Sequence, residues 1–196
     1  MQAVLTKLSV MDLKNMLYTE IEHMGSLFIK QRLREKNENS RYVIEELMNN
    51  CLISLNGIRI PDSDWVSLAE ALMHYMLTVM VLPSQRKIIV DDIEVSIIIP
   101  NARNINKNLD QILIIQFCNS DNSTKNLVER LKAIQPNKQN VWLVSHSPLG
   151  LDMTLRNYVI SDPIGVNDEM ILPFSQIIMD VVHYIDKINY TGFKIL

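Results

Sequence analysis

The sequence has little cysteine and little glycine, and each shortage excludes a class of protein. Only two cysteines, Cys51 and Cys118, occur in 196 residues, and both lie in apolar stretches. Neither a disulfide framework nor a thiolate zinc site is therefore expected, and we predict reduced, buried thiols. The five glycines are isolated. None belongs to a Gly-x-Gly-x-x-Gly or Walker pattern, so nucleotide binding through such loops is excluded.

The chain also lacks an excess of positive charge and a long apolar run. Its formal net charge is −3, so binding of nucleic acid would need a local basic surface. The most apolar run, residues 68–82, carries Glu70 and His74 and is too short and too polar for a membrane span. The first residues lack the basic start and apolar core of a signal peptide, so we expect a cytoplasmic protein that does not contact membranes.

The four histidines do not have the spacing of metal ligands, and no metal site is predicted from them. One of them, His146, lies between Ser145 and Ser147 after a predicted strand, where α/β proteins place ligand-contacting loops. Catalysis by a serine and His146 is not expected, because neighbouring residues seldom face each other for proton transfer. We interpret this segment as a plain loop.

With 47% hydrophobic and 21% charged residues, the chain has an ordinary globular composition. Apolar residues recur every three or four positions over residues 9–36, which predicts one long amphipathic helix with Gly25 as a point of weakness. A second helix is predicted from Ser40. Asn56-Gly57 predicts a turn or a short hairpin.

From residue 62 onward, helical and strand patterns alternate, and Asp91-Asp92 forms the tight turn of a predicted hairpin. The almost unbroken apolar run at 112–118 predicts a central strand that is covered on both faces of the sheet. The helix and strand that follow it imply a parallel crossover. The predicted elements are a helix over 62–82, strands over 87–90, 93–99 and 112–118, a helix from 121 or 123 to 134, a strand over 141–145, an edge strand over 158–160 and a helix over 174–189.

These elements predict an α/β protein close to the α+β class. We expect residues 1–60 to form an N-terminal helical segment. Residues 61–196 are expected to form an α/β core with a C-terminal helix, and the two parts to pack as one compact unit.

The order α-β-β-β-α-β over residues 62–145 resembles the core of the PD-(D/E)XK, or restriction-endonuclease-like, superfamily. There the second strand often reads Glu-Val-Asp followed by aliphatic residues and proline, and the third reads Ile-Glu-Val-Lys. The counterparts here are Glu-Val-Ser-Ile-Ile-Ile-Pro at 94–100 and Ile-Gln-Phe-Cys at 115–118. The resemblance implies a mixed central sheet, with Ser96, Gln116 and Cys118 at the places of the two carboxylates and the lysine.

In such nucleases acidic side chains on neighbouring strands bind Mg²⁺, which polarises the phosphate and activates water, while lysine positions that water. Residues two apart on a strand share a face, so Gln116 and Cys118 should face the same site as Ser96. None of the three is a strong Mg²⁺ ligand or a cation. We therefore predict an inactive nuclease-like fold, with no catalytic residue and no cofactor, that acts as a binding or assembly module.

A displaced active site is the alternative. Glu70 on the first core helix, Asp92 in the hairpin, Asp110 before the third strand and Lys125 on the next helix would then form a Mg²⁺-dependent nuclease site. This requires at least two of the carboxylates to come within about 5 Å of a common point. Otherwise each of these residues is a solvated charge.

Two surfaces are candidates for partners. The long first helix has little within its own segment to cover its apolar face, so we expect it to mediate a homodimer or bind a protein partner. Nucleic acid is a second candidate partner, through a basic run and a basic loop. The residues concerned are Lys30, Arg32, Arg34, Lys36 and Arg41 in the run, and Arg103 and Lys107 in the loop.

Overall fold

Six strands form one mixed sheet in the part of the chain that the computed structural model describes, residues 10–35, 38–105, 108–119, 122–150, 155–161 and 168–190. The strands lie side by side in chain order. The pairs β1·β2 and β2·β3 are antiparallel, and the remaining neighbours are parallel. The strands are β1 Gln85–Val90, β2 Ile93–Ile99, β3 Leu113–Phe117, β4 Val141–Ser145, β5 Arg156–Val159 and β6 Ile171–Pro173.

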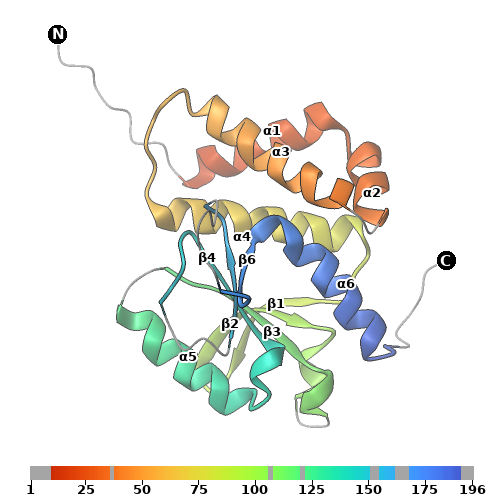
Figure 1. Cartoon of the computed structure of the whole chain (residues 1–196), viewed down its shortest axis with the longest axis vertical. Helices are drawn as coiled ribbons and strands as arrows, with labels where there is room; N and C mark the ends of the chain where they lie inside the picture. The colour runs from red at the N-terminus through yellow and green to blue at the C-terminus, as the bar shows by residue number, and fades with distance from the viewer. Residues whose placement is uncertain are drawn as a thin grey trace.

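Helices cover both faces of the sheet. Figure 1 shows α1, α2 and α3 at one end of the molecule, with α4 between them and the strands. Apolar residues of α4 and α6 pack on one face of the sheet, and those of α5 pack on the other. The helices are α1 Val10–Met24, α2 Ser26–Arg34, α3 Glu38–Ser54, α4 Asp62–Val79, α5 Asn122–Ile134 and α6 Ile177–Lys187, with short 3-10 turns η1 Ala102–Asn104, η2 Leu109–Gln111, η3 Lys138–Asn140 and η4 Phe174–Gln176.

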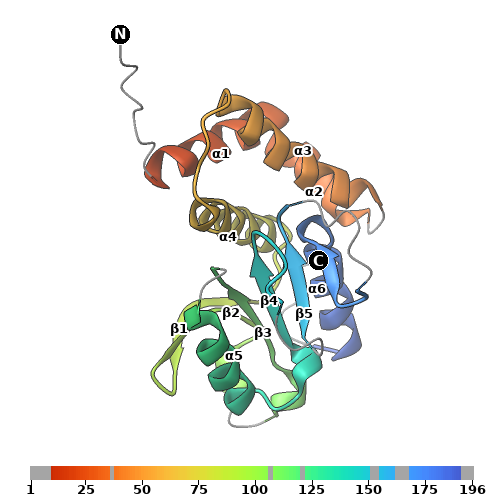
Figure 2. The ribbon, with the colours of Figure 1, turned by 60° about the vertical axis from the view of Figure 1, so that its left-hand side comes forward.

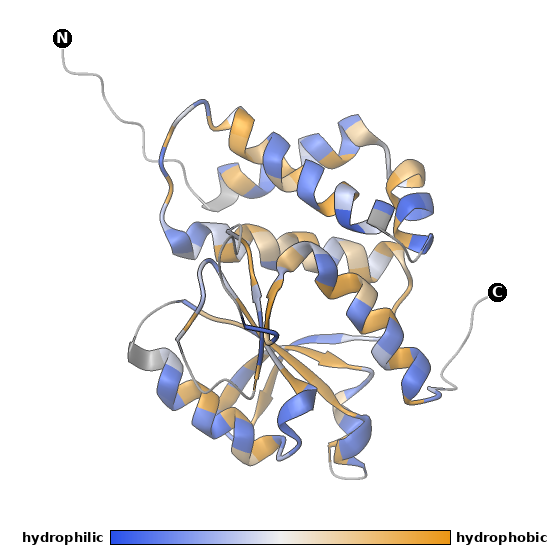
Figure 3. Ribbon diagram, in the orientation of Figure 1, coloured by the Kyte–Doolittle hydropathy of each residue, from blue (hydrophilic) through white to orange (hydrophobic). Residues whose placement is uncertain are grey.

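The N-terminal helices and the sheet share one hydrophobic core. Leu17 of α1, Leu47 of α3, Leu72 of α4 and Ile97 of β2 are all fully buried in the same cluster. Figure 3 shows the central strands as mostly hydrophobic, whereas hydrophilic and hydrophobic residues alternate along α5. None of the helices in the described ranges is both long enough and apolar enough to cross a lipid bilayer.

The single long helix predicted over residues 9–36 is wrong, because the chain breaks at Gly25. This residue has φ +86° and ψ 123°, a backbone conformation that residues other than glycine rarely adopt. Its amide still donates to the carbonyl of Ile21 at 3.0 Å, and its carbonyl accepts from Ile29 at 3.1 Å. The break turns α2 away from α1, and Ile29 and Leu33 of α2 still reach the core.

The turn predicted at Asn56-Gly57 is present, but the hairpin alternative is wrong. Helix α3 continues to Ser54, so the stretch before the turn is helical. This continuation buries both Cys51 and Leu55, which are one helical turn apart. The amide of Ile58 donates to the carbonyl of Leu55 at 2.9 Å and closes the turn.

The α/β core confirms most of the predicted strands and corrects the last one. Asp91 and Asp92 have φ of +47° and +58°, as in the tight type I′ turns that join hairpin strands. Strand β4 runs parallel to β3, as the predicted crossover requires. Strand β5 is not at the edge, because β6 pairs with it on the far side. A strand of only three residues carries too few positions for a period of two to be recognised.

Candidate functional site

Ser96 and Gln116, on neighbouring strands, are brought side by side by the antiparallel register. Ile97 pairs with Ile115, and one step further along the ladder Ser96 comes opposite Gln116. The Ser96 amide donates to Oε1 of Gln116 at 3.1 Å, and the Phe117 amide donates to Oγ of Ser96 at 3.3 Å. At these two residues, side-chain oxygens, and not backbone carbonyls, accept the hydrogen bonds that join β2 to β3.

Cys118 is the third of the residues that the resemblance of the strands assigns to nuclease positions. Its thiol donates a weak, 3.7 Å hydrogen bond to the Gln116 carbonyl, and its amide donates to the Val144 carbonyl at 2.8 Å. Only 7% of Ser96, 6% of Gln116 and 3% of Cys118 is exposed. The three side chains therefore lie together, as the period of two predicts, and are sealed within the protein.

Strand β2 changes the direction of its side chains at Ser96. Ile93 and Val95 pack in the cluster on the α5 face, whereas Ile97 and Ile99 pack in the cluster on the α4 face. A regular strand would keep all four on one face. On β1, the residue that would lie across from Ser96 is Lys87, which has φ +49°. The sheet is thus locally distorted at the level of the candidate site.

This arrangement has little capacity for metal-ion chemistry. Mg²⁺ needs oxygen ligands that converge on one point, usually including one or two carboxylates. Here the Gln116 and Ser96 oxygens accept from backbone amides, and the side chains present are an amide, a hydroxyl and a thiol. Among the described residues, no group of three or more histidine, cysteine or acidic side chains is placed to hold a metal ion.

The structure does not bring the residues of the displaced site together. Asp92 directly precedes β2 and Asp110 shortly precedes β3. Because these strands are antiparallel, the two residues lie at opposite ends of the pair. A strand of seven residues at about 3.3 Å per residue separates them by roughly 20 Å. Lys125 is on α5 and Glu70 on α4, helices on opposite faces of the sheet, and Figure 2 shows the strands between them.

Glu70 is engaged in an ion pair. Its Oε1 lies 3.9 Å from Nη2 of Arg86 on β1, and the two side chains are 22% and 29% exposed. His74 lies one helical turn further along α4, close enough for the charges of Glu70 and Arg86 to affect its pKa. Burial lowers the pKa of His74, as does the positive charge of Arg86, while Glu70 acts in the opposite direction. Glu70 thus has a structural partner already.

The predicted basic surface is partly neutralised by glutamates on the same helices. Arg32 lies 3.3 Å from Oε1 of Glu35. Arg41 lies 3.9 Å from Oε1 of Glu45. Of the remaining predicted residues, Lys30 is half-buried, Arg34 and Arg103 are exposed, and Lys36 and Lys107 lie outside the described residues.

His146 contacts both a serine and an aspartate, but the geometry is not that of a catalytic triad. Nδ1 of His146 lies 3.2 Å from Oγ of Ser147 and 3.3 Å from Oδ1 of Asp62. A triad uses one ring nitrogen for the nucleophile and the other for the acid. Both contacts here fall on the same nitrogen, and the His146 ring also stacks on Trp65 with centroids 6.4 Å apart. The group therefore joins the β4 loop to the start of α4.

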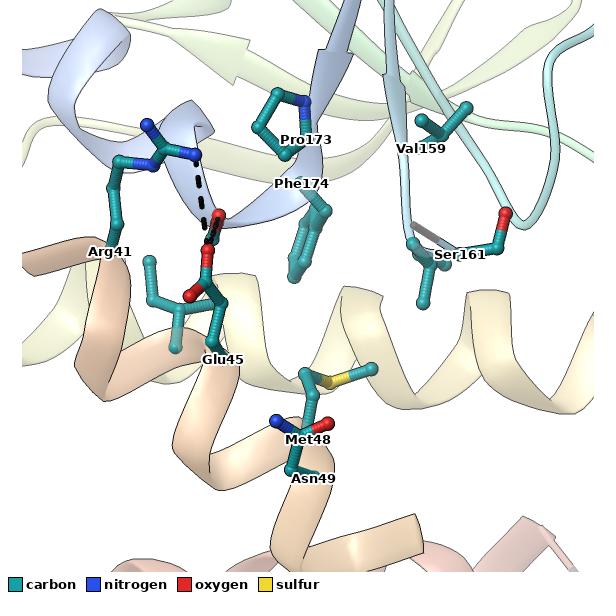
Figure 4. Close-up of a pocket in the computed structure, with 11 residues that line it drawn as sticks. Arg41, Glu45, Met48, Asn49, Val159, Ser161, Pro173 and Phe174 are labelled. Carbon is teal, nitrogen blue, oxygen red and sulfur yellow. Dashed lines mark hydrogen bonds and ion pairs between the residues drawn. The ribbon is translucent and has the colours of Figure 1, made fainter. Parts of the chain in front are cut away.

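A pocket of about 550 Å³, which no sequence pattern indicates, lies between α3 and the ends of β5 and β6 (Figure 4). Its lining comes from three segments that are distant in the sequence, 41–49, 159–161 and 173–175. No motif links these segments. Only a prediction that placed α3 against the ends of β5 and β6 could have found this pocket.

Comparison with known proteins identifies the fold. No protein-family model and no curated protein matches the sequence. Among solved structures, the chain is similar to restriction endonuclease PspGI in complex with substrate DNA, with a TM-score of 0.55 and 14% identity over 89% of this chain and 93% of that one. It is also similar to metal-depleted Ecl18kI in complex with uncleaved, modified DNA, with a TM-score of 0.51 and 11% identity over 96% of this chain and 88% of that one. A second complex of metal-depleted Ecl18kI with uncleaved DNA has a TM-score of 0.52 and 11% identity, over 96% of this chain and 89% of that one. The chain therefore has the restriction-endonuclease-like fold, as the resemblance of its strands implied.

Proposed function

We propose that this protein is a binding module that contacts duplex DNA through a restriction-endonuclease-like fold and does not cleave it. The observation that carries the proposal is the state of Ser96, Gln116 and Cys118. The resemblance of the strands assigns them to nuclease positions, and in the structure they lie together, neutral, buried and hydrogen-bonded within the sheet. A metal-dependent nuclease needs ionised oxygen ligands that are open to the substrate at that place.

DNA is proposed as the partner by analogy with the similar structures, two of which hold uncleaved DNA. This is an argument from fold, so the contacts have to be argued from residues. Arg34 on α2 and Arg103 in η1 are exposed and can reach phosphates. Because the net charge is −3, binding should depend on a few local contacts and be weak.

We further infer that the protein self-associates through its N-terminal helices. Large apolar side chains are exposed there, among them Leu27, which is 82% exposed, and Tyr42 and Ile53. Such side chains together form a surface that gains stability when a partner covers it. A second copy of the chain would double the number of DNA contacts without any change in net charge per chain. A light-scattering mass equal to one chain at micromolar concentration would remove this part of the proposal.

The central test combines binding and cleavage in one experiment. A fluorescent 20-base-pair duplex is titrated with protein at 50 and 200 mM salt, with EDTA, Mg²⁺ or Mn²⁺, and the same samples are run on a denaturing gel. Two phosphate contacts predict a roughly tenfold loss of affinity between the two salt concentrations, and no cleavage with any metal. The double variant Arg34→Gln/Arg103→Gln should bind more weakly with little salt dependence, while Lys187→Gln, an exposed charge on α6, is the matched control.

The alternative function makes a different prediction in the same assay. Cleavage that requires Mg²⁺ or Mn²⁺ and disappears in Glu70→Gln would favour a nuclease with a displaced site. Because Glu70 pairs with Arg86, Arg86→Gln separates the two explanations. A structural role predicts similar losses in both variants, whereas a metal ligand predicts loss of cleavage in Glu70→Gln alone.

A further inference from the structure

The pocket beside α3 lies at the carboxyl ends of two parallel strands. Strands β5 and β6 are parallel neighbours, so their carboxyl ends lie at the same edge of the sheet. The volume, about 550 Å³, is within the usual range for small-molecule sites. None of Ser96, Gln116 and Cys118 lines this pocket, so it is separate from the candidate nuclease position.

The pocket has an apolar side and a polar end. Met48 of α3, Val159 at the end of β5 and Phe174 of η4 supply apolar lining. Arg41 and Glu45, one turn apart on α3, supply charge, and Figure 4 shows them together to one side of Phe174. A ligand that fills this space therefore needs an apolar body and a polar head.

The hydrogen bonds at the polar end favour an anionic head. Oε1 of Glu45 already accepts from the Ser175 hydroxyl at 2.7 Å. Nη2 of Arg41 lies 3.9 Å from the same oxygen, which is too far for a hydrogen bond. Nε of Arg41 is buried, whereas the side chain as a whole is 36% exposed, so the terminal nitrogens of the guanidinium are the atoms open to a ligand. These two nitrogens have the planar geometry to bind a carboxylate or phosphate with two hydrogen bonds.

We propose that this pocket binds a small molecule that carries an anionic head, a carboxylate or a phosphate, on an apolar body. The guanidinium of Arg41 binds the head, and Met48 and Phe174 contact the body. Glu45 orients Ser175 but also repels the head, so it limits the affinity. The proposal does not depend on DNA binding, and its failure would leave the proposed function untouched.

Methionine methyl NMR of the full-length protein tests the proposal directly. The probes are benzoate and phenyl phosphate, with benzyl alcohol as the uncharged control. We expect the Met48 methyl resonance, assigned with Met48→Leu, to move and saturate with at least one of the two anions, and the response to benzyl alcohol to be at least tenfold weaker. The anion with the higher affinity identifies the preferred head. The methyl groups of Met73 and Met76, which are buried in the core and do not line the pocket, should stay in place.

Three variants separate anion binding from a general effect of charge. Arg41→Gln should weaken binding of the better anion at least tenfold, and Arg59→Gln, which changes an exposed arginine between α3 and α4, should leave it unchanged. Glu45→Gln should strengthen binding, a gain that loss of folding cannot produce. Unmoved Met73 and Met76 resonances show that each variant is folded. The proposal is overturned if neither anion moves the Met48 resonance, or if Arg41→Gln and Arg59→Gln bind the anion equally well.

Discussion

Replacing Gln116 by glutamate tests whether the nuclease position is sealed or open. The substitution keeps the shape of the side chain and introduces the acidic residue that the resemblance leads one to expect on this strand. In the structure, Oε1 of Gln116 accepts from the Ser96 amide, while Nε2 donates to the Phe117 carbonyl at 3.4 Å. A carboxylate keeps the first contact. Its second oxygen would face the Phe117 carbonyl with no proton between them, unless the acid is protonated.

The magnitude follows from burial. A carboxyl group with 6% exposure and one repulsive contact should have a pKa raised by about 2 units above its unfolded value of about 4.3. Each unit corresponds to about 1.4 kcal/mol, so the variant should lose roughly 3 kcal/mol of folding free energy once the acid is ionised. A pKa that is higher in the folded state means that stability is retained below pH 4 and lost as the pH rises towards about 6 or 7.

Urea denaturation at several pH values between 4 and 8 measures this loss. Gln31→Glu, at an exposed position of α2, is the matched control and should follow the wild-type curve. If Gln116→Glu is as stable as wild type at pH 8, the position is open to solvent and the argument for a sealed site is refuted. Stabilisation of the variant by millimolar Mg²⁺ would also contradict it, because the metal can bind only if further ligands converge there.

Three other predictions test the surrounding fold. Gly25→Ala should cost about 1–2 kcal/mol of stability, because Gly25 has φ +86°, and urea denaturation of an exposed Ser26→Ala control should show a smaller loss. Tyr158→Phe should cost about 1–3 kcal/mol, since the hydroxyl donates to the largely buried Asp180 carboxylate at 2.6 Å; an unchanged unfolding midpoint would contradict this. Burial raises the pKa of the Cys51 thiol to about 12, so iodoacetamide at pH 8 should not label it in the folded protein. Labelling of Cys51 measured by mass spectrometry should become fast in urea, and equal rates in both states would show that the thiol is accessible.

The elements with a clear hydrophobic period could be predicted, and those whose form depends on tertiary contacts could not. The hairpin with its Asp91-Asp92 turn and the buried strands are local patterns, and the structure has them. The stretch before Asn56 has the composition of a strand, yet it is the end of α3 because the core lies on the helical face of Cys51 and Leu55. Local sequence preference allows either a strand or a helix here, and packing against other elements selects the helix.

The candidate site could be predicted only where it follows from local patterns, and not where it depends on tertiary contacts. The pairing of Ser96 with Gln116 follows from the order of the strands and the period of two, and the structure has it. The positions of Asp92 and Asp110 depend on which ends of β2 and β3 meet, which requires the sheet topology. The pocket at Arg41 depends on the packing of α3 against the sheet, for which the sequence contains no local signal.

The distortion at Ser96 gives the polar residues on β2 and β3 a structural role that is independent of catalysis. Strand β2 changes face there, and the amides of Ser96 and Phe117 donate to side-chain oxygens. If both residues were apolar, two buried N–H groups would lose these acceptors, at a cost of about 1–3 kcal/mol each. Ser96 and Gln116 therefore stabilise the sheet at this level, whatever the protein binds. Polar side chains at positions 96 and 116 are explained by the hydrogen bonding between β2 and β3. Only ionised side chains there would be evidence for a nuclease.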